Sequence, residues 1–250
     1  MDKSKWLSGV VAAVPLFVAF EAFAAGGGVE LEASDIDPGN VASLQRGARN
    51  FMNYCSGCHS AQYVRYNTIG KDLELSEEQL VDNLMFNAEK TFETITVSMP
   101  AKSAARWFGN PPPDLSLLAR SKGPDYIYNF LKGFYLDAES PTGVDNHVLQ
   151  GTSMPHVLWE LQGYKRAKFA EHTEDGVTSR EFEGFEKVTA GSLDEEDYDD
   201  FVRDTVNFLA YIAEPIRSER RKLGVWVLMY LIVFLVIAAM LKKQIWKDVK

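Results

Sequence analysis

The chain has 250 residues, of which 46% are hydrophobic and 24% charged, which is typical of a globular protein with one large domain or two small ones. Its formal net charge is -9, but the charge is unevenly distributed: residues 25–214 carry -15, whereas residues 215–250 are basic. A central region this acidic repels nucleic acid and favours a basic protein partner. The composition therefore argues against a nucleic-acid-binding protein.

The N-terminus has the pattern of a secretory signal peptide. Lys3 and Lys5 precede an apolar stretch, and Ala22-Phe23-Ala24 offers the small-x-small pattern of a cleavage site. We predict a signal peptide over residues 1–24, with the mature protein starting near Ala25. An uncleaved N-terminal anchor is the alternative, although the apolar stretch is short for a membrane span.

A helix is predicted to begin at Asp37-Pro38, because aspartate is a good N-cap and proline suits the first helical position. Apolar residues at helical spacing follow: Val41, Leu44, Ala48 and Phe51. This amphipathic helix leads directly to the sequence Cys55-Ser56-Gly57-Cys58-His59, which contains both cysteines of the protein.

The spacing Cys-x-x-Cys-His is the attachment pattern of a c-type haem. Two thiols about one helical turn apart add to the vinyl groups of the porphyrin, and the imidazole of the next residue reaches the iron. The alternatives are a structural disulfide, a thioredoxin-like redox pair or half of a zinc site. No second cysteine pair completes a zinc tetrahedron, and no βαβ pattern surrounds the motif.

Three further helices are predicted downstream. Ser76 with Gln79 forms a capping-box pattern, Gly123-Pro124 introduces a short helix that ends near Gly133, and Ser192 with Glu195 repeats the capping pattern. The last of these helices has the clearest apolar period, and Pro215 should end or bend it before the membrane span. Long loops rich in glycine and proline are predicted over residues 98–116 and 137–156, and covering a haem would explain their length.

The second axial ligand of the iron is not fixed by the haem motif. Two methionines in loops are candidates, Met99 and Met154, and both precede a proline. His147 and His156 are the competing nitrogen ligands. Position favours Met154, because its loop lies well downstream and precedes the terminal helix. Thioether ligation raises the reduction potential, which suits an electron carrier.

Residues 223–241 form a stretch without charges that is long enough to span a bilayer as a helix. We predict three regions: a signal peptide (1–24), an exported haem domain (25–215) and a C-terminal anchor with a short tail (216–250). Basic residues flank both ends of the span, so they do not fix its orientation. Export of the N-terminus would leave the haem domain in the periplasm and the C-terminus in the cytoplasm.

Several strings of residues resemble a known family. They are Pro112-Pro113-Asp114-Leu115-Ser116 with Arg120 downstream, and Ala213-Glu214-Pro215 with Arg221-Lys222 and Gly224 before the anchor. Together with one haem motif, a late Met-Pro and a single C-terminal span, the chain resembles cytochrome c1, the haem subunit of the ubiquinol:cytochrome c oxidoreductase (cytochrome bc1) complex. The loops between Pro141 and Met154 and between Gly163 and Ser192 differ from the mitochondrial pattern.

The resemblance implies an all-α fold: a class I cytochrome c-like haem domain with long loops, plus one C-terminal transmembrane helix. It implies covalent haem c on Cys55 and Cys58, with His59 and Met154 as axial ligands. Arg120 is then a partner of a haem propionate, and Pro112, Pro113 and Tyr126 are counted among the residues that contact the haem. The chain itself has no acid/base catalytic site on this interpretation.

The resemblance also implies partners. Electrons arrive from the Rieske iron-sulfur subunit and leave to a periplasmic cytochrome c, in a complex with cytochrome b that we expect to be dimeric and to lie in a bacterial inner membrane. Residues 171–200 hold twelve acidic and two basic side chains, which would attract a basic carrier. A solvated acidic loop is the alternative.

Two other functions fit part of the sequence. A membrane-anchored monohaem cytochrome of another respiratory chain shares every haem feature, and lacks only the strings around Asp114 and Glu214. A tethered periplasmic thiol protein without haem shares only the cysteine pair. Covalent haem and association with cytochrome b would separate the three.

Overall fold

The computed structural model describes residues 29–97, 99–174 and 177–248. The predicted signal peptide and its cleavage site therefore lie outside the described residues. The helices are α2 (Val41–Tyr54), α3 (Tyr66–Asp72), α4 (Glu77–Leu84), α5 (Ala101–Phe108), α6 (Leu118–Lys122), α7 (Pro124–Lys132), α8 (Trp159–Gln162), α9 (Glu195–Ala213) and α10 (Arg217–Ile245), with a 3-10 turn η2 (Trp246–Asp248) at the end. The strands are β1 (Ala61–Arg65), β2 (Thr94–Ile95), β3 (Phe134–Leu136), β4 (Val144–Asn146), β5 (Lys165–Glu174) and β6 (Val177–Lys187).

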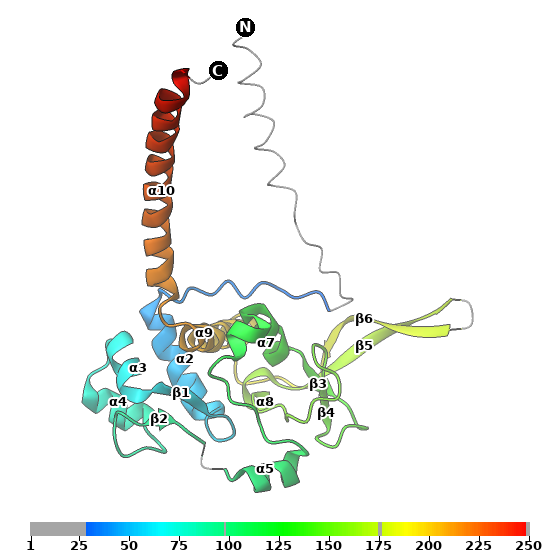
Figure 1. Ribbon diagram of the computed structural model, residues 1–250. Helices are drawn as coiled ribbons and strands as arrows, with labels where there is room; N and C mark the ends of the chain where they lie inside the picture. Colours follow the sequence, from blue (N-terminus) through cyan, green and yellow to red (C-terminus); the bar gives the residue numbers. More distant parts are fainter. Residues whose placement is uncertain (1–28, 98, 175–176, 249–250) are drawn as a thin grey trace. The chain divides into compact units, whose positions relative to one another are not determined.

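The core of the domain is built where α2 lies against α9 (Figure 1). Phe51 of α2 and Phe208 of α9 are fully buried, with their ring centroids 5.7 Å apart. Gly47 makes this close approach possible, because a Cβ there would lie 2.1 Å from the carbonyl oxygen of Asp204. The helix that carries the haem motif is thus fixed to the longest helix of the soluble part.

The predicted start of α2 at Asp37 is wrong by three residues. Asn40 is the N-cap, and its side chain accepts a hydrogen bond from the backbone N–H of Ser43 at 3.1 Å. Asp37 instead accepts from the N–H of Gly39 and closes the turn before the helix. Both residues are good caps, so local sequence does not distinguish them.

The other two cap predictions have different outcomes. The capping box of Ser76 and Gln79 is confirmed at the start of α4, with both reciprocal hydrogen bonds present. At α9 the predicted cap, Ser192, is wrong: Asp194 accepts from the N–H of Asp197 at 2.9 Å. The backbone of Ser192 instead donates to the carbonyl of Glu160, which ties the loop to α8.

Helices α7 and α9 end where they were predicted to end. α7 runs from Pro124 to Lys132, with Gly133 as its C-cap, and α9 ends at Ala213, two residues before Pro215. The apolar period of α9 is confirmed, since the side chains along its second half are buried.

Three antiparallel strand pairs supplement the helices: β1 with β2, β3 with β4, and β5 with β6. The prediction of a loop over 98–116 is wrong for residues 101–108, which form α5, and the predicted loop over 137–156 contains β4. The β5–β6 hairpin is long and contacts β3 (Figure 1). The predicted helical fold class is nevertheless confirmed, and the three strand pairs are additions that the all-α prediction did not include.

The C-terminal helix α10 is apolar and long enough to cross a membrane, with a mean hydropathy of 2.7 over its most apolar part. Its large apolar side chains are exposed. A helix with apolar residues on every side is stable only where something other than water covers it. α10 is therefore compatible with a membrane anchor.

Candidate haem site

The haem motif continues the helical path of α2 for one more turn. The N–H of Cys55 donates to the carbonyl of Phe51 at 2.9 Å, and the N–H of His59 donates to the carbonyl of Cys55 at 2.8 Å. The N–H of Cys58 also donates to Cys55, at 3.0 Å. Both thiols are free and half-buried. The backbone therefore places the second thiol and the imidazole one turn after the first thiol, as the motif predicts.

The ring of His59 is oriented by a backbone carbonyl. Its Nδ1 lies 2.8 Å from the carbonyl oxygen of Pro113. A carbonyl oxygen only accepts hydrogen bonds, so Nδ1 carries the proton and the lone pair of Nε2 is left for a metal. This is the tautomer that an axial histidine needs.

The segment that supplies this carbonyl is joined to the residues after His59. The N–H of Leu115 donates to the carbonyl of Ser60 at 2.8 Å, and the N–H of Tyr63 donates to the hydroxyl of Ser116 at 3.1 Å. Asp114 accepts three hydrogen bonds in the same place. From the sequence, Asp114 stood out only as part of the Pro-Pro-Asp-Leu-Ser string, although an Asp-x-Ser turn is a recognisable local pattern.

Burial determines the protonation of the motif. It raises the pKa of the Cys55 thiol to about 12, with a smaller contribution from Cys58, and it raises the pKa of Cys58. Burial also lowers the pKa of His59, against the opposing effects of the Pro113 hydrogen bond and the Asp114 charge. At neutral pH both thiols are protonated and the imidazole is neutral, so the motif itself carries no charge.

Met154 lies half-buried against the same hydrophobic core as Cys55 and Tyr126. The loop before it is organised by two polar side chains. Oδ1 of Asp145 accepts from the N–H of Gly151 at 2.7 Å, and fully buried Asn146 donates from Nδ2 to the carbonyl of Phe130 at 2.7 Å. Asn146 Oδ1 also accepts two backbone N–H groups of the loop.

The competing ligands have other surroundings. The ring of His147 stacks on Phe182 with centroids 3.7 Å apart, and buried His156 stacks on Phe134 at 5.0 Å. Met99 is half-buried immediately before α5. Both histidines are thus packed against aromatic rings on the β3 side of the domain.

The remaining predicted residues lie at different depths. Pro112 and Tyr126 are half-buried, and Tyr126 stacks on Phe130 with centroids 6.3 Å apart. Pro113 and Arg120 are exposed. Of these four, only Pro113 has a hydrogen bond to the haem motif among the described residues.

A half-buried lysine, Lys165, lies at the base of the hairpin and was not anticipated from the sequence. Lys165 Nζ donates to the carbonyl of Lys132 at 2.6 Å and lies 4.1 Å from the ring centroid of Phe185. Burial, and to a lesser extent the positive charge of Lys132, lower the pKa of Lys165 to about 8. Lys132 in turn pairs with Glu32 and Asp199, each at 2.9 Å.

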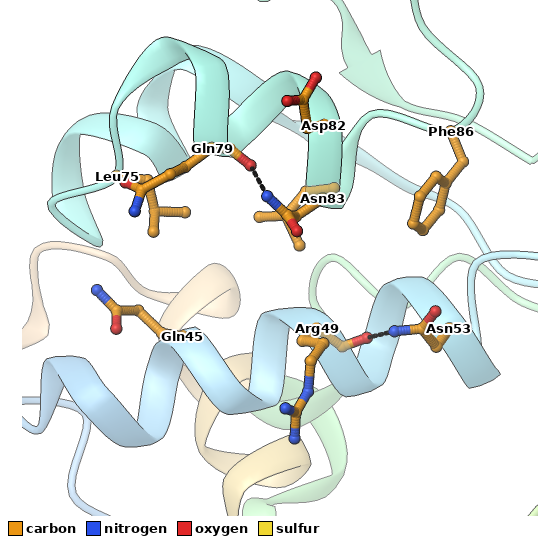
Figure 2. A pocket seen from close by; sticks show the side chains of 9 residues that line it. Gln45, Arg49, Asn53, Leu75, Gln79, Asp82, Asn83 and Phe86 are labelled. Atoms are coloured by element: carbon orange, nitrogen blue, oxygen red, sulfur yellow. Dashed lines mark hydrogen bonds between the residues drawn. The ribbon is translucent and has the colours of Figure 1, made fainter.

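A separate hollow of about 350 Å³ lies between α2 and α4. Figure 2 shows Gln45, Arg49 and Asn53 on one side of it, facing Gln79 and Asn83 on the other. It contains none of the residues predicted to bind haem. The hollow is therefore distinct from the haem site.

The residues of the motif fit a covalently attached haem. Two free thiols and an imidazole with its Nε2 lone pair available form the donor set that the group requires. Among the described residues, no group of three or more His, Cys, Asp or Glu side chains could hold a bare metal ion. The fold and the site together define a c-type cytochrome with a C-terminal apolar helix.

Comparison with known proteins gives the family. The sequence model of the Cytochrome C1 family matches residues 37–249. Cytochrome c1 of Allochromatium vinosum is 46% identical over 226 residues, covering 90% of this chain and 92% of that protein. A Nitrosomonas europaea protein named ammonia monooxygenase gamma subunit is 36% identical, covering 94% and 95%. Cytochrome c1 of Rhodospirillum rubrum is 29% identical, covering 96% of both chains.

The chain therefore belongs to the cytochrome c1 family. It is an electron-transfer protein of the cytochrome bc1 complex and carries covalent haem c, for which Cys55 and Cys58 have the required spacing.

Proposed function

We propose that His59 and Met154 are the axial ligands of the haem, and that the chain passes single electrons from the Rieske iron-sulfur subunit to a periplasmic cytochrome c. The observation that carries this proposal is the bond between His59 Nδ1 and the Pro113 carbonyl, which leaves Nε2 for iron. Haem c supplies a one-electron ferric/ferrous couple. No bond to substrate is made, so the residues of the chain set the reduction potential of the iron and the position of the haem.

Met154 is the proposed ligand on the opposite side. It lies against the core that also supports Cys55, and its thioether stabilises ferrous iron. The aromatic stacking of His147 and His156 gives both histidines a packing role that does not require iron. Pro112, Pro113 and Tyr126 are proposed to contact the porphyrin, and exposed Arg120 to pair with a propionate.

The proposed docking site for the basic acceptor is the acidic start of α9. Glu195, Glu196 and Asp197 are exposed in its first turn. Other acids nearby have structural partners: Asp199 pairs with Lys132, and Asp200 with Arg203. Only part of the acidic run is thus available for long-range attraction of a carrier.

We further propose three regions, with a signal peptide over 1–24, a periplasmic haem domain over 25–215 and an anchor over 216–250. The C-terminus would then be cytoplasmic. As a subunit of a quinol:cytochrome c oxidoreductase, this chain would act beside cytochrome b and the Rieske protein. A C-terminal reporter that is active only in the cytoplasm tests the orientation, and activity of a periplasm-only reporter would contradict it.

Covalent attachment and complex membership are tested together. The full chain purified with its membrane partners should retain haem on a denaturing gel and co-purify with a dihaem cytochrome b. Replacing both cysteines by serine should abolish the haem stain. A stained chain that never associates with cytochrome b would identify the monohaem cytochrome of another respiratory chain.

The docking proposal predicts that electron transfer to a basic cytochrome c slows as salt is added, because screening weakens the attraction. Replacing Glu195, Glu196 and Asp197 by their amides should lower the low-salt rate several-fold. The matched control replaces Glu77 and Glu78, exposed acids in the first turn of α4, by glutamine. Equal effects of the two sets would contradict a specific docking site.

A further inference from the structure

Asp114 lies beside the residue whose carbonyl orients His59, and its carboxylate is held by both chain segments that meet there. Oδ2 accepts from the hydroxyl of Ser60 at 2.7 Å and from the N–H of Gln62 at 2.9 Å. Oδ1 accepts from the N–H of Ser116 at 2.9 Å. One side chain thus joins the residues just after His59 to the residues just after Pro113.

The consequence for His59 is geometric. Its Nδ1 bond to Pro113 depends on how the segment from 113 to 116 lies against the segment from 59 to 63. The backbone bond from Leu115 to Ser60 and the bond from Tyr63 to Ser116 act between the same two segments. Asp114 is the only carboxylate among these contacts in the described chain, and it makes more of them than any other side chain.

The consequence is also electrostatic. The negative charge of Asp114 lies beside the backbone that bonds to the ring, because Asp114 directly follows Pro113 in the chain. The pKa of Asp114 itself is lowered: burial opposes ionisation, but the hydrogen bonds from Ser116, Gln62 and Ser60 outweigh it. The carboxylate is ionised at neutral pH.

We propose that Asp114 is a positioning residue for the axial histidine, which fixes the Pro113 carbonyl against His59 Nδ1 and thereby lowers the reduction potential of the haem. A firmly held hydrogen bond to Nδ1 makes the imidazole a stronger donor to iron, and a nearby negative charge favours the ferric state. Both effects lower the reduction potential. The inference rests on the proposed role of His59 as a ligand.

The test is a redox titration of the intact chain in its complex. Asp114→Asn removes the charge and replaces one of the two accepting oxygens by an NH2 group, so the N–H of either Gln62 or Ser116 loses its acceptor. We expect the ferrous-to-ferric ratio at a fixed ambient potential to rise by about tenfold, which for one electron is about 59 mV. The His59 Nδ1 proton, followed by NMR in the ferrous state, should exchange faster with solvent.

Two further variants separate positioning from folding. Ser60→Ala keeps the charge but removes one accepted hydrogen bond, so it should give a smaller shift in the same direction. If the Asp114→Asn variant cannot be produced with haem attached, the potential of Ser60→Ala tests the proposal in its place. The control is Asp204→Asn. It also removes a carboxylate that accepts two hydrogen bonds, both from Arg46, which lies in the half of α2 farther from the haem motif. It should lower stability and leave the potential unchanged.

Two results would overturn the proposal. If Asp114→Asn unfolds more easily but keeps the wild-type potential and proton exchange, while Met154→Leu lowers the potential, Asp114 is structural and the ligand assignment stands. If neither Asp114→Asn nor Met154→Leu changes the potential, the ligand assignment itself fails.

Discussion

The two sides of the haem site are built differently. On the His59 side, the proposed ligand lies on the helical turn that follows α2, within a few residues of both cysteines, and its ring is bonded to the carbonyl of Pro113. On the Met154 side, the candidate ligand follows a loop that is held from within by Asp145 and Asn146. The first side contains the two cysteines of the motif, whereas the second is held by non-covalent contacts: the hydrogen bonds of Asp145 and of buried Asn146, and the packing of Met154 on the core.

This difference indicates which changes should affect haem binding and which should affect the reduction potential. Loss of one hydrogen bond on the His59 side leaves the cysteines in place, so haem binding should survive while the electronics change. If a buried polar contact in the Met154 loop is lost, no covalent bond keeps the loop in place. We therefore expect the Met154 side to dominate changes in ligation and stability.

The largest effect should come from Met154 itself. Met154→Leu removes the proposed thioether, and the reduction potential should fall by on the order of 100 mV or more, since axial ligands tune haem potentials over about 0.8 V. Redox titration measures it. Met99→Leu is the matched control and should be silent; a shift in the control instead would move the ligand to Met99.

Next comes the loop that delivers this ligand. Asn146→Ala leaves the carbonyl of Phe130 and the amides of Val148 and Leu149 without their partner, so the free energy of unfolding should fall by about 3 kcal/mol. Chemical unfolding in detergent, followed by circular dichroism, measures the change.

The control for this loop is Asn83→Ala, which removes one exposed hydrogen bond to the carbonyl of Gln79. It should cost less than about 0.5 kcal/mol. Equal losses for the two variants would show that Asn146 does not organise the Met154 loop.

A smaller, pH-dependent effect should come from Lys165. Its pKa is lowered to about 8 in the folded chain, so between about pH 8 and 10 the unfolded chain holds the proton more tightly. Stability should therefore rise with pH across this window, by on the order of 2 kcal/mol. Above the window the trend should reverse, because the buried hydroxyls of Tyr198 and Tyr211 have raised pKa values and ionise only on unfolding.

Lys165→Met should abolish this rise. Lys168→Met, at an exposed position on the same strand, should keep it. An unchanged pH profile in Lys165→Met would mean that Lys165 is not the group that titrates.

Local patterns predicted the parts of the site that are local. The capping box at Ser76, the helix after Gly123 and the cysteine motif each depend on residues within a few positions of each other, and each forms as predicted. The caps at Asp37 and Ser192 failed because an equally good acceptor, Asn40 or Asp194, lies two or three residues on.

The features that escaped prediction depend on distant partners. Gly47 has meaning only against the backbone of Asp204, and Asp114 only against Ser60 and Gln62. The β5–β6 hairpin has weak alternation in its sequence and was not predicted; its aromatic side chains pack on β3 residue Tyr135 and on His147. No spacing rule connects residues so far apart in the chain.

The central claim is that one nitrogen ligand, from His59, and one sulfur ligand, from Met154, complete the coordination of the iron. X-ray absorption at the iron edge of the reduced protein tests it most directly, because it counts the sulfur neighbours of the iron. We predict one sulfur and five nitrogens. Six nitrogens, or five without a sulfur, would contradict the account.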